Sequence, residues 1–238
     1  MSLDQVKALT FDVFGTVVDW RTSIAREAEA ALAPKGYALD WAAFADAWRA
    51  RYQPAMQAVR TGARPFAKLD ILHRENLDAL LPEFGVEALS EAELDHLNRA
   101  WHRLTPWPDS PEGLARLKGK YVIATQSNGN VALMVNMAKY GGLPWDAILG
   151  AEVCQAYKPM PEAYLRAADL LGLKPEECMM TAAHNDDLIA AASCGFRTAF
   201  VARPTEKGPN QTKDLVPDPS VDIAADSFIE LADKLGCP

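Results

Sequence analysis

The stretch LTFDVFGTVVDW, residues 9–20, decides how the rest of the chain is interpreted. A short apolar run ends in one carboxylate, Asp12, and a Gly-Thr pair begins three residues later. An apolar run of this length bounded by turn residues predicts a buried strand, here over residues 6–13. Asp12 therefore stands at the carboxyl end of a buried strand, with the aromatic Phe14 two positions further on.

Beyond residue 120 the sequence alternates between strand and helix patterns. Such alternation is typical of a parallel sheet covered by helices on both faces, which makes an α/β fold. We predict strands over 121–127, 147–152, 178–183, 197–202 and 221–227, and helices over 129–141, 161–172, 185–195 and 228–236.

Between the first strand and residue 103 the pattern is helical throughout. Asp40 is a plausible N-cap for a helix that we expect to end near Pro54. Ser90 and Glu93 have the spacing of a capping box at the start of another helix. We see no strand candidate in this region.

These patterns predict two parts. A Rossmann-like α/β core is expected from residues 1–18 and 104–238, with a helical cap domain of residues 19–103 inserted into it. Ligands bind beyond the carboxyl ends of parallel strands, and the insertion leaves from that edge. We therefore expect the cap to form a lid over the site.

The composition narrows the class of partner. The chain has 238 residues and a net charge of −8, which argues against nucleic acid. No apolar run is long enough to span a bilayer, and no signal peptide is recognisable. The four cysteines form no C-x-x-C pair, so a zinc site is not expected and a reducing cytoplasm is the simplest setting.

Several polar residues fall at the predicted carboxyl edge of the sheet. A carboxylate such as Asp12 can act as a nucleophile, and a lysine such as Lys158 would keep it ionised. Ser127, Asn128 and the N-terminus of the following helix could hold an anionic group. The simplest alternative is that Asp12 only caps a turn, but Asp187 arrives at the same edge and favours a functional site.

Four segments resemble the motifs of the haloacid dehalogenase superfamily in order and spacing. They are FDVFGT at 11–16, ATQSNG at 124–129, YKPMPEAY at 157–164 and NDDLIAAASCGF at 185–196. The superfamily consists mostly of Mg²⁺-dependent phosphatases. These phosphatases carry a second Asp in the first motif, which is the general acid, and an acidic pair in the fourth motif, which helps to hold Mg²⁺. Phe14 and Ala183 occupy those positions here. The general acid and one metal-ligating carboxylate are therefore missing, and we expect no metal and no other cofactor.

What remains is similar to the metal-free 2-haloacid dehalogenase branch, whose first motif carries an aromatic residue at the position of Phe14. A halide needs no protonation to leave, so the missing acid is no obstacle. The resemblance implies attack of Asp12 on C2 of a small 2-haloacid, an aspartyl ester, and hydrolysis to a 2-hydroxy acid. Homodimers are common in the family, and we expect one only on that analogy.

The resemblance also assigns roles along the site. Thr16 and Lys158 are expected to orient Asp12, and Asp187 matches the acid of the fourth motif. Ser127 would bind the substrate carboxylate. The halide would meet Asn128 and Arg49, with Arg51 as the competing choice. Phe14 and Tyr164 complete the expected substrate contacts.

The fourth motif departs from the family pattern. A serine and an asparagine that position the hydrolytic water are replaced by Ala182 and His184. A neutral His184 could orient or activate water, and Asn185 could replace the missing amide. We hypothesise an altered halide pocket that accepts fluoride. The remaining histidines, His73, His96 and His102, are expected on the cap surface.

Three other functions stay open from the sequence. The same aspartyl ester chemistry could open another carbon electrophile, such as a strained cyclic amino acid. A Mg²⁺-dependent phosphatase is disfavoured by Phe14 and Ala183. A binding module that kept only the fold is disfavoured because Asp12, Lys158 and Asp187 are all present.

Overall fold

The computed structural model describes residues 3–238, and a six-stranded parallel sheet forms its centre. The strand order is β5-β4-β1-β6-β7-β8, which confirms the α/β fold expected from the alternating pattern. The strands are β1 (Ala8–Phe11), β4 (Val122–Ser127), β5 (Ala147–Gly150), β6 (Cys178–Ala182), β7 (Arg197–Val201) and β8 (Ile223–Ala225). β1 lies between β4 and β6, so the strand that ends before Asp12 is central.

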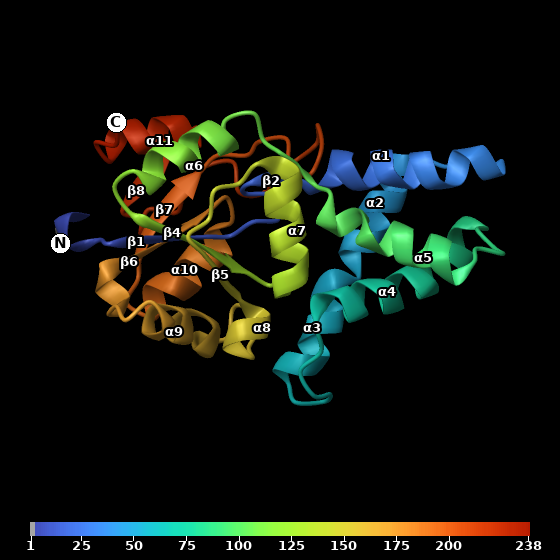
Figure 1. Cartoon of the computed structure of the whole chain (residues 1–238), viewed down its shortest axis with the longest axis horizontal. Coiled ribbons are helices and arrows are strands. Elements are labelled where there is room, and N and C mark those ends of the chain that lie inside the picture. Colours follow the sequence, from blue (N-terminus) through green and yellow to red (C-terminus); the bar gives the residue numbers. More distant parts are fainter. Residues whose placement is uncertain (1–2) are drawn as a thin grey trace.

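Helices cover both faces of this sheet (Figure 1). α6 (Ser110–Lys118) and α11 (Phe228–Lys234) lie on one face, and α9 (Pro161–Leu170) and α10 (Asn185–Ser193) lie on the other. α7 (Val131–Gly141) and the short α8 (Ala151–Cys154) complete the core. Successive β1 residues belong to different apolar clusters: Leu9 packs with the α6 and α11 side, and Ala8 with the α9 and α10 side. This alternation follows from the two-residue period of a strand.

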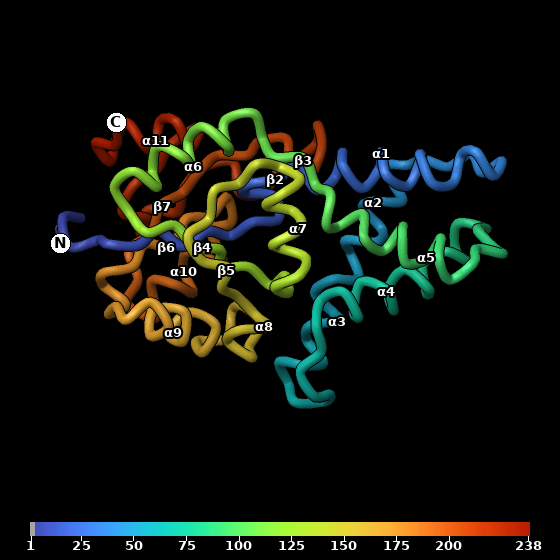
Figure 2. The backbone as a smooth tube through the Cα atoms, viewed as in Figure 1, coloured from blue at the N-terminus to red at the C-terminus, as the bar shows by residue number. Residues whose placement is uncertain are grey.

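The inserted helices form a separate lobe at one end of the molecule (Figure 1). They are α1 (Trp20–Leu32), α2 (Trp41–Ala50), α3 (Tyr52–Arg60), α4 (Leu69–Leu80) and α5 (Glu91–Asn98). The chain enters and leaves this cap through a two-stranded antiparallel ribbon, β2 (Val18–Asp19) with β3 (Thr105–Pro106). Figure 2 shows the two crossings side by side. Short 3₁₀ turns lie at Leu3–Gln5, Ala33–Lys35, Leu81–Phe84, Arg99–His102 and Pro175–Glu177.

The two predicted helix caps are confirmed, but one predicted helix end is wrong. The Asp40 carboxylate accepts a hydrogen bond from Ala43 N at 2.9 Å, and Ser90 with Glu93 forms a capping box. The helix that begins after Asp40 ends at Ala50, and Pro54 lies in the first turn of the next helix, α3. Proline is tolerated there because its missing N–H has no partner in a first turn.

Two of the three histidines expected on the cap surface are buried. His73 is stacked on Trp101 with ring centroids 4.4 Å apart, and burial lowers its pKa to about 3, so it is neutral. His102 lies between Asp70, 2.9 Å from its Nε2, and Asn136, 3.0 Å from its Nδ1. Only His96 is exposed as expected.

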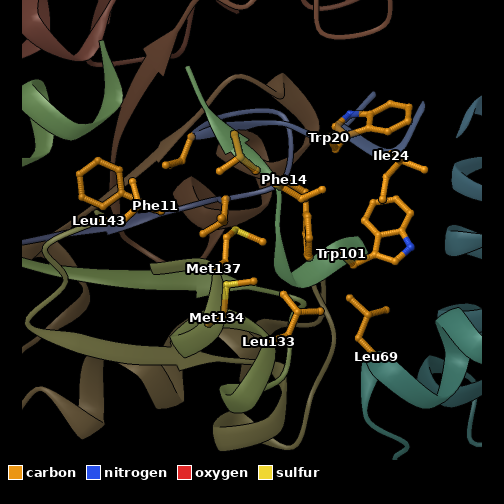
Figure 3. Close-up of a cluster of buried hydrophobic side chains, with 14 of the residues drawn as sticks. Phe11, Phe14, Trp20, Ile24, Leu69, Trp101, Leu133, Met134, Met137 and Leu143 are labelled. Atoms are coloured by element: carbon orange, nitrogen blue, oxygen red, sulfur yellow. The ribbon is translucent and has the colours of Figure 1, made fainter. Parts of the chain in front are cut away.

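Phe14 joins the core to the cap. Figure 3 shows it between the α7 side chains and the cap residues Trp20 and Trp101. Its ring makes edge contacts with Trp101 and Tyr52, and 2% of the residue is exposed.

No helix in the described part of the chain is both long and apolar enough to cross a membrane.

Candidate active site

A cavity of about 690 Å³ lies between the cap and the carboxyl edge of the sheet. Its core wall comes from the ends of β1 and β4 and from the loops before α9 and α10, and its cap wall comes from α2 and α3. The residues that line it include Asp12, Asn128, Lys158, Tyr164, His184 and Asp187 from the core, and Arg49, Tyr52, Gln53, Gln57 and Arg60 from the cap. Parallel-sheet topology therefore gathers residues that are far apart in sequence.

Asp12 is the most heavily bonded group in this cavity. Its Oδ1 accepts from Lys158 Nζ at 2.9 Å, and its Oδ2 accepts from Thr16 Oγ1 at 2.7 Å and lies 3.1 Å from His184 Nδ1. Burial alone would raise the pKa of this carboxyl, but the charges and hydrogen bonds of Lys158 and His184 outweigh burial and hold it well below its usual value. Each carboxylate oxygen has two lone pairs, so Oδ1 keeps one free and Oδ2 keeps none.

The turn after Asp12 fixes the orientation of Thr16. The Thr16 hydroxyl accepts a hydrogen bond from Ala183 N at 2.9 Å, so its own proton points to Asp12. Gly15 has φ +87°, a left-handed conformation that glycine adopts without strain. This backbone contact requires no side chain at position 183, which is consistent with alanine there.

Lys158 lies between two carboxylates, Asp12 and Asp187, and bonds both through Nζ. Burial would lower the pKa of the lysine, but the two negative charges raise it above its usual value. Asp187 is held in turn by the Tyr164 hydroxyl, which donates to its Oδ1 at 2.6 Å. The chain Tyr164–Asp187–Lys158 therefore orients the ammonium group toward Asp12.

His184 bridges Asp12 to a second buried carboxylate, Glu206. The distance from His184 Nε2 to Glu206 Oε2 is 3.0 Å, and Trp20 Nε1 donates to the other Glu206 oxygen at 2.8 Å. Burial would lower the pKa of the imidazole, but Glu206 and Asp12 raise it to about 10. Carboxylates only accept hydrogen bonds, so both ring nitrogens donate and His184 is a cation at neutral pH. The expected neutral imidazole is therefore wrong for the free protein.

Glu206 was not predicted from the sequence. It lies in the loop that follows β7, five residues after Val201, and 2% of the residue is exposed. A Cβ atom on Gly15 would stand 2.2 Å from Glu206 Oε1, so the glycine also makes room for the carboxylate. The available signal was positional: Glu206 follows a strand whose carboxyl end lies at the same edge as Asp12.

Arg49 enters the cavity from α2, and its competitor Arg51 does not line it. The Arg49 guanidinium carbon lies 4.0 Å from the Tyr52 ring centroid and 5.4 Å from that of Trp20. Its buried Nη1 has no hydrogen-bond partner among residues 3–238. Arg51 instead forms an ion pair with Glu83 at 2.5 Å. A cation over aromatic faces with an open donor suits a small anion.

The remaining predicted residues divide into two groups. The Asn128 carboxamide lines the cavity and its Oδ1 accepts from Lys158 N at 2.9 Å. Ser127 is buried behind it, where its Oγ accepts from Gly129 N at 3.1 Å. Asn185 bonds Asp214 and the carbonyl of Val216, so its amide ties down the neighbouring loop. Phe14 packs under Arg49 at 5.8 Å. The structure thus brings Asn128 into the cavity and uses the side chains of Ser127, Asn185 and Phe14 in the wall behind it.

Several acidic side chains at this site are engaged by cationic groups. Within residues 3–238 no group of three His, Cys, Asp or Glu side chains is arranged to hold a metal ion. Asp12 and Asp187 lie on either side of Lys158, and both bond its ammonium group.

The fold and this site place the chain among aspartate-based hydrolases with an inserted cap. The family model "Hydrolase: haloacid dehalogenase-like hydrolase" matches residues 6–195, and the chain belongs to this family. A curated relative, (S)-2-haloacid dehalogenase 4A of Burkholderia cepacia, is 30% identical over 204 residues, which cover 84% of this chain and 85% of the relative.

Two solved structures are more similar still. The defluorinating L-2-haloacid dehalogenase Rha0230 is 53% identical with a TM-score of 0.95, over 98% of this chain and 96% of the other. The L-2-haloacid dehalogenase PA0810 is 47% identical with a TM-score of 0.93, over 97% of this chain and 99% of the other. The expected resemblance to the 2-haloacid dehalogenase branch is confirmed.

Proposed function

We propose that this protein hydrolyses the carbon–halogen bond of short (S)-2-haloacids to give 2-hydroxy acids and halide. The observation that carries the proposal is Asp12, an ionised carboxylate with one lone pair of Oδ1 open, facing a cavity with no proton donor at position 14. The kinship with (S)- and L-2-haloacid dehalogenases supports both the reaction and the enantiomer.

In the first step Asp12 Oδ1 attacks C2 of the haloacid from the side opposite the halogen. The C2–halogen bond breaks with its electron pair, and an ester forms between Asp12 and C2 with inversion of the carbon. Arg49 lies where its positive charge and open Nη1 can stabilise the departing halide. Asn128 lines the same cavity and supplies an amide.

In the second step water attacks the Asp12 carbonyl carbon and the bond between that carbon and Oδ1 breaks. Oδ1 leaves with the product as its hydroxyl oxygen, so Asp12 receives its replacement oxygen from water. Ester formation removes the negative charge of Asp12, and with it one of the two charges that raise the pKa of His184. His184 then more readily loses a proton to solvent. The neutral imidazole can accept a proton from the attacking water and pass it to Oδ1 as the product leaves, while Glu206 stabilises the imidazolium that forms in between.

This arrangement makes His184 a base that becomes available only after the first step. In the free protein the imidazole is a cation and helps to keep Asp12 ionised. In the ester it has one acidic partner left, Glu206. Its basicity is therefore regulated by the covalent state of Asp12.

Fluoroacetate is included among the proposed substrates. Support comes from the 53% identity to an L-2-haloacid dehalogenase described as defluorinating, and from the His184 departure in the fourth motif. The direct test is release of fluoride from fluoroacetate, followed with an ion-selective electrode, beside release of chloride from chloroacetate. Chloride release without fluoride release would remove fluoroacetate from the proposal and leave the dehalogenase function intact.

The proposed reaction as a whole is tested with (S)-2-chloropropionate and the Asp12→Asn variant. Wild type should release one chloride and one lactate per turnover without added metal and with EDTA present, and Asp12→Asn should release neither. Activity that requires Mg²⁺ would contradict the proposed mechanism.

Three further properties belong to the proposal. Metal independence is supported by Phe14 and Ala183 at the positions of acids in the phosphatases. A reducing cytoplasm is supported by cysteines that are all unpaired in the described structure. A homodimer rests on family analogy and is tested by light scattering.

A further inference from the structure

The charged groups that line the cavity are almost all paired. Lys158 bonds Asp12 and Asp187. Asp186 pairs with Lys213 at 2.5 Å, and the Asp214 carboxylate lies 3.5 Å from Lys207 Nζ. Two guanidinium groups remain, and in the described part of the chain neither forms an ion pair with a carboxylate: Arg49 deep in the cavity, and Arg60 at the end of α3.

Arg49 interacts electrostatically with the Glu206 carboxylate, since it is one of the groups that lower the pKa of Glu206. Burial lowers the pKa of the Arg60 guanidinium, and among residues 3–238 only Tyr52, with a smaller effect, and no carboxylate opposes this shift. A guanidinium that bonds only neutral acceptors leaves its positive charge available to an anion that enters the cavity. Arg60 therefore requires a separate explanation.

Neutral groups hold the Arg60 guanidinium in place. Its Nε donates to Gln57 Oε1 at 2.9 Å, its Nη2 donates to Gln53 Oε1 at 3.0 Å, and its Nη1 donates to the Lys158 carbonyl at 2.8 Å. Because these amide oxygens point at Arg60, the amide N–H groups of Gln53 and Gln57 are left as donors at the cavity wall. One N–H of Nη1 is also left. These contacts orient a positive group beside the backbone of the lysine that bonds the nucleophile.

We propose that Arg60, with Gln53 and Gln57, forms a carboxylate-capture site that binds the anionic end of a 2-haloacid on its way to Asp12. The proposal rests on the proposed dehalogenase function for the identity of the substrate. The capture site gives a role to the positive charge of Arg60, which takes no part in the proposed reaction at Asp12. A partly buried cation at a cavity wall that is not paired with a carboxylate attracts anions electrostatically.

Fastening the cap is a poor alternative explanation for Arg60. Other bonds already join the cap to the core: Tyr157 Oη donates to the Ala67 carbonyl at 2.7 Å, and Lys68 pairs with Glu152 at 2.6 Å. A fastening role would also not require a charge, since the Lys158 carbonyl is a neutral acceptor. Charge is thus the property to test.

The experiment compares three variants with wild type. Arg60→Gln removes the charge, and Arg60→Lys keeps it but changes the bonding. Arg64→Gln is the matched control, because Arg64 lies four residues further on, pairs with Glu75 at 2.7 Å and does not line the cavity. Binding of propionate, an unreactive analogue, is measured by calorimetry at low and high salt. KM and kcat for (S)-2-chloropropionate are measured in parallel.

We expect Arg60→Gln to weaken propionate binding by about three- to tenfold at low salt and to flatten the salt dependence, as loss of one charge-assisted contact does. Arg60→Lys should recover most of this loss, and Arg64→Gln should match wild type. In turnover, Arg60→Gln should raise KM by a larger factor than it changes kcat.

Two results would overturn the capture site. One is propionate binding in Arg60→Gln that equals wild type at both salt concentrations. The other is Arg60→Lys as impaired as Arg60→Gln, with kcat reduced and the salt dependence unchanged, which is what a fastening role gives. If wild type bound propionate through Arg60 but released no halide, the capture site would stand and the dehalogenase proposal would fail.

Discussion

Replacing Glu206 by Gln should lower the pKa of His184 and slow hydrolysis of the ester intermediate. The pKa of His184 is raised from 6.5 to about 10, a difference of 3.5 units. At 1.36 kcal/mol per unit this corresponds to about 5 kcal/mol in favour of the protonated imidazole. This is the net effect: Glu206 and Asp12 stabilise the cation, and burial opposes them. Losing one of the two carboxylates should lower the pKa of His184 by more than half of this shift, because burial continues to oppose the cation.

The same arithmetic applies to the ester intermediate, in which Asp12 has lost its charge. With a pKa of about 10, roughly 1% of His184 is neutral at pH 8, and each unit by which ester formation lowers that pKa raises the neutral fraction by up to about tenfold. The first step should therefore raise the supply of neutral imidazole in wild type by more than about tenfold. Without Glu206 the neutral form is available too early, and the imidazolium that forms during ester hydrolysis loses its counter-charge.

The assay has two parts. Two-dimensional NMR of the imidazole signals gives the pKa of His184 in wild type, Glu206→Gln and Asp12→Asn. Rapid-quench kinetics gives the rates of halide release and of lactate release separately. We expect a pKa lower by about 2 units in each variant, and in Glu206→Gln a burst of halide followed by slow lactate release. A wild-type His184 that titrates near 6.5, or lactate release unaffected in Glu206→Gln, would refute the coupling.

The other predictions concern the neighbours of Asp12. Arg49→Gln should lower kcat for 2-chloropropionate by about 10²-fold or more, since a group that stabilises developing charge is lost, whereas Arg51→Gln should stay within about twofold of wild type. Phe14→Ala should lower the free energy of unfolding by about 3–5 kcal/mol in urea denaturation, because a fully buried ring between core and cap leaves a cavity; a loss below 1 kcal/mol would contradict its packing role. The raised pKa of His184 means that its contribution to stability is complete below pH 6.5 and is lost as the pH rises through about 10. Wild type should therefore lose more unfolding free energy than His184→Gln between pH 7 and pH 10, and equal losses would argue against the ion pairs.

The fold was predictable because its signals are local. Alternating strand and helix patterns, the N-cap at Asp40 and the capping box at Ser90 each depend on a few adjacent residues. Asp12 and Lys158 were predictable because strand ends meet at one sheet edge, and they do bond at 2.9 Å.

The charge state of His184 was not predictable because it depends on a residue that no local pattern marks. Trp20 and Glu206 are 186 positions apart in sequence, and the Glu206 carboxylate is buried only because the loop after β7 folds back on Gly15. Without Glu206 the sequence suggests an ordinary neutral imidazole.

The burial of His73 was missed although a local signal existed. Leu69, Leu72, Leu77 and Leu80 are the buried apolar positions of α4, and His73 lies on the same helical stripe. At this place in α4 the position on the helical stripe indicates burial more reliably than the polarity of the side chain does. The aromatic ring of Trp101 accepts it there as a neutral stacking partner.

The central claim is that Asp12 is the nucleophile and forms an ester with the substrate. Single-turnover hydrolysis of (S)-2-chloropropionate in ¹⁸O-water, with enzyme in excess, tests it by mass spectrometry of the peptide that contains Asp12. The account predicts one ¹⁸O in the Asp12 carboxylate and none in the lactate hydroxyl, since that oxygen comes from Oδ1. Label in the lactate hydroxyl with an unlabelled Asp12 would mean that water attacks C2 directly, and the account would be wrong.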